Sequence, residues 1–357
     1  MQKFKFFLIA FFLLPIFSTV SQDRSDDRRP LKRELENHLD DKIPRLNGPI
    51  EEHIQKLLPY KPLKEENSAT EFPQQDPRER LFTVEKRNLT TWTTAMSLAI
   101  PTSVLVQGVM SWDWGKDKKK FGFGTEGFFD PNSYSGGADK TGHMMSHYIQ
   151  KRFYTWLFYN LGHDLDDAQL FGILGAGLTG LMIELGDGIS RYKFSWEDIL
   201  MDSIGITLGW VLDQYPKLDE LIGLRWEWFP SDNYLDKRQK DKFDFMSDYD
   251  GQKFYLTLKA KGIPLLREKW YTRYLTLDVG YFTRGYKPDH TRGKMRNQNN
   301  SQWWSYGMGI NLGSLITDLA PNSKIAKVMG SITKYWVPPG IIYAGSSNLT
   351  GGKHQYK

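Results

Sequence analysis

Apolar residues gather in the middle of the chain, in segments that repeat with the period of an α-helix. Pro101 is expected to kink the first of these segments. Polar and glycine-containing connections separate them from one another. Four helices are therefore predicted, over residues 92–110, 139–161, 165–184 and 195–212. Together they indicate a small helical bundle.

The third of these helices carries small residues at every fourth position. Gly172, Ala176 and Gly180 fall on one stripe, and the stripe continues to Glu184. Stripes of small residues let two helices approach closely inside a membrane. Because the other sides of this helix are apolar, Glu184 is expected to be internal and to face a neighbouring helix.

After residue 215 the apolar pattern changes from a helical period toward a period of two. Leu275, Leu277 and Val279 alternate with polar residues, as in a half-buried strand. The pattern predicts four strands, over residues 224–229, 253–261, 275–282 and 303–312. Four strands are too few to close a membrane barrel, which needs about eight. An antiparallel sheet packed on the bundle is therefore expected.

The fold class that follows is α+β, with a glycine-rich apolar helical bundle followed by a small antiparallel β-sheet region. The bundle is expected to form a membrane-associated domain over residues 81–215, and the β-rich region is expected over residues 216–345. A last amphipathic helix is predicted at residues 323–335. Residues 346–357 are expected to form a flexible tail.

The first residues have the pattern of a secretory signal peptide. Two lysines precede an apolar run at residues 6–17, and small residues lie just before Gln22. The run is too short to cross a hydrocarbon layer of about 30 Å, which favours cleavage over an uncleaved anchor. We therefore expect a signal peptide at residues 1–21 and export to the periplasm. Residues 22–80 are charged and rich in proline, which predicts a disordered spacer.

The amino-acid composition excludes several kinds of chemistry and indicates which kind of partner to expect. The 357 residues include no cysteine, which removes disulfides, thiolate catalysis, cysteine-bound zinc and an acylated N-terminal cysteine. The charge of +5 is modest and its basic residues are interleaved with acidic ones, so no nucleic-acid partner is expected. The 12 Trp and 18 Tyr favour a membrane interface, although an aromatic-rich soluble core has the same composition. The expected partner is membrane or envelope lipid, at the inner or outer membrane.

Ionisable residues fall on the apolar helices in three groups. Inside an apolar bundle they are costly unless paired, so they mark functional sites more often than surface charges do. His143, Glu184 and Asp198 lie at the polar ends of helices, and antiparallel packing would bring these ends together. We predict that these three form a candidate catalytic cluster, because neither His143 nor Glu184 has a local capping role. The supporting members are Asp139, Asp187 and Asp202.

Local structural roles explain some of the same residues. Asp139 is at a position suited to a helix N-cap, and Asp187 lies in a Gly-Asp-Gly sequence typical of a turn. Ser195 and Asp198 have the spacing of a capping box, in which the acidic residue satisfies the helix terminus. His147 is expected to be an ordinary interface or surface residue.

Three blocks of sequence carry a family resemblance. They are Ser135-Gly-Gly-Ala-Asp-Lys-Thr-Gly-His143, Glu184-Leu-Gly-Asp-Gly188 and Ser195-Trp-Glu-Asp198. In this order they resemble the YfiM-like family of bacterial periplasmic proteins, a domain of unknown function, and more distantly VanZ-type membrane proteins with an Asp-Lys-x-x-His motif. The resemblance extends over residues 81–212 and implies a periplasmic location and key positions, not a reaction. The chain departs from both patterns, because it lacks a lipoprotein cysteine and has Asp202 where the VanZ-like pattern has Asn.

Two functions from different classes fit these features. In a binding or structural envelope protein, the polar cluster would hold the helices in one register. In a membrane-associated hydrolase or transferase acting on lipid or cell-wall glycan, His143 would be a general base, or a metal would be bound by His143, Glu184 and Asp198. The sequence identifies no cofactor and has no nucleophile elbow, zincin helix or dinucleotide fingerprint, which favours the first function. The two differ in whether the cluster opens to water or is sealed and mutually paired.

Overall fold

The computed structural model describes most of the chain after residue 79. The described residues are 80, 82, 84–112, 114–115, 120–125, 127–235, 245–286 and 300–350. The expected signal peptide at residues 1–21, nearly all of the expected spacer and residues 351–357 of the expected tail lie outside the described residues.

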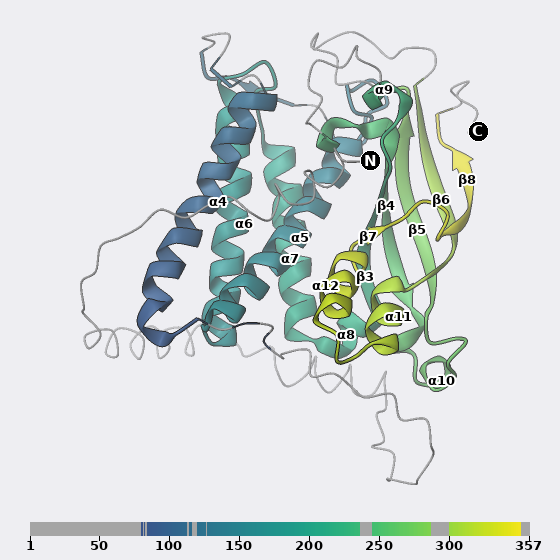
Figure 1. Ribbon diagram of the computed structural model, residues 1–357. Coiled ribbons are helices and arrows are strands. Elements are labelled where there is room, and N and C mark those ends of the chain that lie inside the picture. The colour runs from purple at the N-terminus through teal and green to yellow at the C-terminus, as the bar shows by residue number, and fades with distance from the viewer. Residues whose placement is uncertain are drawn as a thin grey trace, which may run out of the picture. The chain divides into compact units, whose positions relative to one another are not determined.

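Four long helices form a bundle, in agreement with the four predicted segments (Figure 1). They are α4 (Leu89–Ser111), α5 (Ala138–Leu161), α6 (Leu165–Gly188) and α7 (Trp196–Gln214). α5 packs against both α6 and α7, and α4 packs mainly against α6. Ile100, Phe158, Leu161 and Ala168 form an apolar core among α4, α5 and α6. α5 is therefore the central helix, with neighbours on two sides.

The start of α5 and the end of α6 differ from what the sequence predicts. α5 begins after Gly137, whose φ of +91° favours glycine, so Gly137 rather than Asp139 is the N-cap residue. α6 continues to Gly188, so Asp187 lies in its last turn and not in a loop. There Oδ1 of Asp187 accepts a hydrogen bond of 2.9 Å from Nε1 of Trp114. The glycine before Asp187 fits beneath the indole ring of Trp114, so close packing explains it better than turn chemistry does.

The small-residue stripe of α6 faces α5. A Cβ atom at Gly172 would lie 2.1 Å from Oγ1 of Thr155 and 2.8 Å from the carbonyl oxygen of Lys151. Ala176, one turn further along the stripe, is completely buried. The close approach of α5 and α6 therefore requires small residues on this side of α6, as the four-residue spacing predicts.

A six-stranded mixed sheet packs on the bundle, in the strand order β7-β3-β4-β5-β6-β8 (Figure 1). The strands are β3 (Ile222–Trp228), β4 (Gln252–Lys259), β5 (Leu275–Arg284), β6 (Ser301–Ile310), β7 (Trp336–Val337) and β8 (Tyr343–Asn348). β3 and β7 are parallel and the other neighbours are antiparallel, so the expectation of a purely antiparallel sheet is wrong at this edge. The sequence pattern does not predict β7, which has two residues, or β8, which is mostly small and polar.

Shorter elements connect these parts. β1 (Phe123–Gly124) and β2 (Phe194–Ser195) form a separate two-stranded parallel sheet. The short helices are α8 (Pro216–Leu221), α9 (Asp232–Leu235), α10 (Pro264–Arg267), α11 (Leu312–Leu319) and α12 (Lys324–Thr333). The 3-10 turns are η1 (Lys86–Asn88), η2 (Phe245–Ser247), η3 (Tyr249–Gly251) and η4 (Ala260–Gly262). α12 corresponds to the predicted last helix, and the fold class is α+β.

The two faces of the six-stranded sheet have different partners. One face packs on the bundle, where Leu224 and Phe254 join an apolar core with Met145, Tyr148 and Leu212. This core takes its sheet residues from β3 and β4, and α5 also lies close to β5. The bundle therefore covers part of the apolar face of the sheet.

The opposite face of the sheet is polar and closed. Arg225 donates a hydrogen bond of 2.5 Å to Oδ1 of Asp278, and Oγ1 of Thr257 donates to the same oxygen at 2.6 Å. Val337 and Ile342, from the chain after α12, form a small apolar core with a tyrosine of this face. A charged pair is therefore sealed between the sheet and the C-terminal part of the chain.

Candidate functional site

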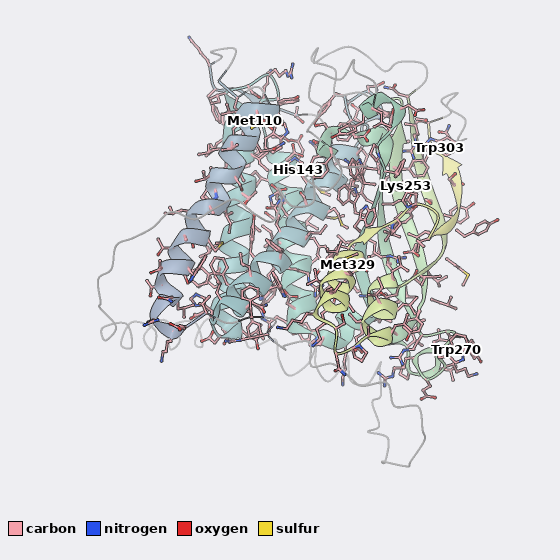
Figure 2. The ribbon with its side chains drawn as sticks, viewed as in Figure 1. Met110, His143, Lys253, Trp270, Trp303 and Met329 are labelled. Atoms are coloured by element: carbon pink, nitrogen blue, oxygen red, sulfur yellow. The ribbon has the colours of Figure 1, made fainter. Side chains whose placement is uncertain are left out.

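Six ionisable side chains from two helices meet inside the bundle, and we call them the His143 cluster. They are Asp139, Lys140, His143 and His147 from α5, and Asp198 and Asp202 from α7. The members on α5 share one face because they are spaced by three or four positions. Figure 2 places the labelled His143 within the helical bundle. The cluster therefore joins the central helix to one of its two neighbours.

His143 has carboxylates near both of its ring nitrogens. Nδ1 lies 2.9 Å from Oδ1 of Asp202. Nε2 lies 3.9 Å from Oδ1 of Asp139 and 3.9 Å from Oδ1 of Asp198. Carboxylates around an imidazole favour its protonated form. The sequence prediction grouped His143 with Glu184 and Asp198 and gave Asp202 a supporting place, whereas in the structure Asp202 is nearer to His143 than Asp198 is.

Lys140 is a member of the cluster that the sequence prediction missed. Its Nζ lies 2.7 and 2.9 Å from the two carboxylate oxygens of Asp198 and 3.1 Å from Oδ2 of Asp139. The lysine side chain is buried, so this contact is sealed from water. The signal that could have found it is the Asp-Lys-x-x-His spacing, since residues three apart on a helix share a face and Lys140 lies three before His143.

His147 is also a member of the cluster, although the sequence predicted an ordinary residue. Its ring is completely buried, and Nδ1 lies 2.6 Å from Oδ1 of Asp202. Among the described residues, Nε2 of His147 and Oδ2 of Asp202 have no hydrogen-bond partner. Both atoms face Gly180 on α6, where a Cβ would lie 2.9 Å from Nε2 and 2.4 Å from Oδ2. The absence of a side chain at Gly180 makes room for these two atoms.

Glu184 contacts the start of α7 instead of His143. Its Oε2 accepts a hydrogen bond of 2.7 Å from the backbone N–H of Ser195, the N-cap residue of α7. Oγ of Ser195 in turn accepts from the N–H of Asp198. Glu184 thus takes the place of the acidic residue in a capping box, which leaves the carboxylate of Asp198 for Lys140. The sequence analysis expected no local capping role for Glu184, and in the structure it caps the next helix instead of its own.

The structure divides the predicted site residues into two sets. Those that it brings together are His143, Asp198, Asp139 and Asp202. Those that it directs to other partners are Glu184, which bonds to Ser195, and Asp187, which bonds to Trp114. The second set lies in the last turns of α6, where the start of α7 and the loop after α4 supply hydrogen-bond donors.

Burial and neighbouring charges set the protonation of the cluster. Burial alone would lower the pKa of His143, but the carboxylates of Asp198 and Asp202 raise it well above 6.5. Burial raises the pKa of Asp202, but the two histidines outweigh it and lower the pKa far below its ordinary value. The pKa of Asp139 is also lowered, because the charges of Lys140 and His143 outweigh burial. At neutral pH the cluster therefore holds a charged imidazole beside ionised Asp139 and Asp202.

Two overlapping groups in the cluster have the composition of a cation site. Each group places one ligand atom per residue within 4.8 Å of the others. The groups are His143 with His147 and Asp202, and His143 with Asp139 and Asp198. Glu184 belongs to neither group. In the second group, the ammonium of Lys140 already supplies a positive charge to the carboxylates.

Comparisons with known proteins bear on the part of the chain that carries this cluster. Residues 125–214 match DUF2279, a family described as predicted periplasmic lipoproteins. The DUF2279 segment is about a quarter of the 357 residues, and it contains the whole His143 cluster together with Gly180 and Glu184. No match was found among curated proteins or among solved structures.

The DUF2279 match supports a periplasmic, cell-envelope protein of unknown function. It agrees with the location that the sequence resemblance implies, while the finer YfiM-like and VanZ-like relations are not confirmed. The sequence contains no cysteine, so none of its residues offers the thiol that carries the lipid of a lipoprotein.

Proposed function

We propose that the protein is a membrane-associated cell-envelope protein with a structural or binding role, in which the His143 cluster locks α5 against α7. The observation that carries this proposal is that most of the cluster is buried and that its side chains contact one another, while His143 and Asp139 are partly exposed. Lys140 and His147 are 1% and 0% exposed, and Asp198 and Asp202 are 5% and 3% exposed. A catalytic site needs access for its substrate, whereas these side chains are turned toward one another.

Paired charges fix the register of the two helices. Lys140 on α5 pairs with Asp198 on α7, and the imidazole of His147, two turns further along α5, lies against the carboxylate of Asp202, one turn further along α7. A shift by one helical turn, about 5.4 Å, would separate both pairs. Removing one partner from a buried ion pair costs about 3–5 kcal/mol, because the other charge stays buried without compensation. The cluster therefore favours one alignment of α5 and α7 over its neighbours.

The outer surface of the bundle supports membrane association. Large apolar side chains on α6 are about half exposed, namely Leu170, Leu174, Leu178, Leu181 and Leu185. α4 exposes a similar set, which includes Leu98, Leu105 and Val109. The helices Lys86–Ser111 and Leu165–Gly188 are long and apolar enough to cross a membrane, and only 17% and 39% of their apolar windows are buried. Extended apolar surfaces of this kind mark membrane or protein contacts.

Neutralising single members of the cluster tests the structural role. Lys140→Met and Asp202→Asn each leave a buried charged neighbour without its partner, so the Tm of the purified full-length protein in detergent should fall for both. The matched control is Lys217→Met on α8, because Lys217 is exposed and its replacement should change Tm little. Catalytic residues often lower the stability of a protein, so replacing one of them commonly leaves its stability unchanged or raises it. An unchanged or higher Tm for both cluster variants would contradict the structural role.

One observation favours a second candidate function, which is the binding of a divalent cation. Nε2 of His147 and Oδ2 of Asp202 are buried without a hydrogen-bond partner among the described residues, and both atom types are common metal ligands. Metal analysis of protein purified without chelator tests this candidate. A stoichiometric metal that is lost in His147→Ala would support it. Metal-free protein whose Tm does not change when zinc or manganese is added would exclude it.

An enzyme acting on lipid or cell-wall glycan would need a different role for His143. A general base has to be unprotonated at the working pH, whereas the raised pKa keeps His143 charged at neutral pH. In such a hydrolase or transferase, His143 would act as an acid or as an electrostatic partner of the substrate. Hydrolysis of lipid or glycan that is lost in His143→Gln at unchanged Tm would favour this alternative.

A further inference from the structure

The six-stranded sheet has its polar side covered and part of its apolar side open. In a one-sided antiparallel sheet of a water-soluble protein, the apolar side packs on the core and the polar side meets water. Here the polar side is closed, and Arg225, Thr257 and Asp278 on it are buried. The apolar side is covered by α5 at Leu224 and Phe254, whereas apolar side chains over β5 and β6 are exposed.

The exposed apolar side chains form two rows that cross neighbouring strands, and we call them the open sheet face. One row is Leu256, Val279 and Tyr306, and the adjacent row is Leu277, Met308 and Tyr343. These six side chains are between 51% and 89% exposed. Residues paired across strands lie side by side, so the two rows make one contiguous apolar surface. Surfaces of this kind mark an interaction site.

The connection between β4 and β5 adds an exposed aromatic tip. Leu265, Trp270 and Tyr271 are largely exposed there, and the exposed Lys269 precedes Trp270 in the chain. Figure 2 shows the labelled Trp270 beyond the end of the sheet, away from the bundle. Trp and Tyr favour the boundary between acyl chains and lipid headgroups, and lysine extends its charge to the headgroups.

We propose that the open sheet face contacts the acyl chains of a phospholipid bilayer, with Trp270 and Tyr271 at the level of the headgroups. The occupant is lipid because the protein has a second exposed apolar surface, on α4 and α6, which is separate from the sheet. One bilayer supplies an apolar medium for both surfaces, whereas protein partners would have to match two unrelated surfaces. The sheet contact goes beyond the membrane contact proposed for the helices, and either contact can fail alone.

Site-specific fluorescence can locate each surface, because the chain has no cysteine and a single introduced cysteine carries the only dye. Tyr306→Cys and Met308→Cys probe the open sheet face, and Leu174→Cys probes α6. Glu220→Cys, at an exposed acidic position on α8, is the aqueous control. The full-length variants are reconstituted in phosphatidylcholine vesicles and labelled with an environment-sensitive dye. Quenching by doxyl-labelled acyl chains reports contact with lipid, and quenching by iodide reports contact with water.

The expected result is a loss of fluorescence with doxyl lipid but not with iodide at Tyr306 and Met308, and the reverse at Glu220. If Tyr306→Cys or Met308→Cys does not fold, Leu277→Cys, in the same row as Met308, is used in its place. Iodide quenching at the sheet positions would overturn the proposal, and doxyl quenching at Leu174 would then show that the helical contact stands. Protection from both quenchers, together with a cross-linked dimer, would also overturn it, because a second copy would cover the sheet. Iodide quenching at Leu174 alone would instead contradict the helical contact.

Discussion

Asp202 is the residue on which both histidines of the cluster converge. Its Oδ1 lies 2.9 Å from Nδ1 of His143 and 2.6 Å from Nδ1 of His147, while Oδ2 faces Gly180. A carboxylate between two imidazoles explains why the pKa of Asp202 is lowered in spite of burial and why that of His143 is raised. At the residue scale, the cluster therefore couples stability to pH.

The alkaline side of the stability profile reports on His143. Its folded-state pKa lies well above 6.5, so its stabilising contribution is complete below pH 6.5 and is lost as pH rises through the folded-state value. The carboxylates nearest to its ring are those of Asp139, Asp198 and Asp202, with Lys140 beside them, and its charge also acts on Glu184 and Asp187 of α6. The free energy of unfolding should therefore fall with rising pH, and His143→Gln should reduce this loss. Urea unfolding of both proteins between about pH 6 and pH 10 measures the difference. The same profile in both proteins would contradict a charged His143.

Gly180 should accept no side chain at the contact with the cluster. In Gly180→Ala the new methyl group would overlap Oδ2 of Asp202 and Nε2 of His147, and the two histidines hold Asp202 in place. Overpacking costs about 1–3 kcal/mol. Gly177 on the same helix has nothing within 4 Å of its Cβ position, so Gly177→Ala should be neutral or stabilising by up to about 1 kcal/mol. Thermal unfolding compares the variants, and a loss no greater for Gly180→Ala would contradict the close contact.

At the scale of helices and strands, the features that depend on periodic or local sequence patterns were predicted, whereas those that depend on contacts between elements were not. The four long helices follow from their apolar period, and Ser195 is the N-cap that its spacing predicts. Asp139 was misassigned because the loop before α5 ends on Gly137 at positive φ. The hydrogen bond of Glu184 was not predicted, because the N–H that donates it belongs to the next helix. β7 pairs with a strand far away in the sequence, and no short-range pattern contains that pairing.

The capping contact between α6 and α7 has its own test. Glu184→Leu would leave the buried N–H of Ser195 without an acceptor, which costs about 1–3 kcal/mol. Glu184→Gln keeps a carbonyl oxygen that can accept this hydrogen bond, so its loss of stability should be smaller. Chemical denaturation of the two variants gives the comparison. If Glu184→Gln and Glu184→Leu destabilise the protein equally, Glu184 does not stabilise it through the hydrogen bond to Ser195.

At the scale of the whole molecule, the sequence predicts the α+β class but not how the surfaces are used. The alternating pattern of β5 shows which residues share a face, and only the structure shows that the polar face is the one covered. The cluster was predicted in part, because His143 and Asp198 lie at the polar ends of apolar helices, with Asp139 and Asp202 as supporting members. Lys140 and His147 were not predicted, because their contacts depend on the packing of α5 against α7, for example on the fit of Gly205 against the carbonyl oxygen of Met144.

Export and membrane association can be tested together on the full-length chain. Expressed in a Gram-negative host, the mature protein should begin at Gln22 and should sediment with membranes. Apolar contact with lipid is not broken by high pH or salt, so an alkaline carbonate wash should leave the protein in the pellet. N-terminal sequencing and fractionation give the answer. An uncleaved chain in the cytosol would contradict export, and release by carbonate would contradict the apolar contact.

The charged lock between α5 and α7 is tested most directly by the coupling free energy between Lys140 and Asp198. A double-mutant cycle of Lys140→Met and Asp198→Leu, measured by chemical denaturation, isolates that coupling. Each single change should cost about 3–5 kcal/mol, because it leaves one buried charge without its main partner. The double variant removes both charges, so its loss should fall short of the sum by at least about 1 kcal/mol. Losses that simply add would show that the two residues do not act as a pair, and would contradict the lock.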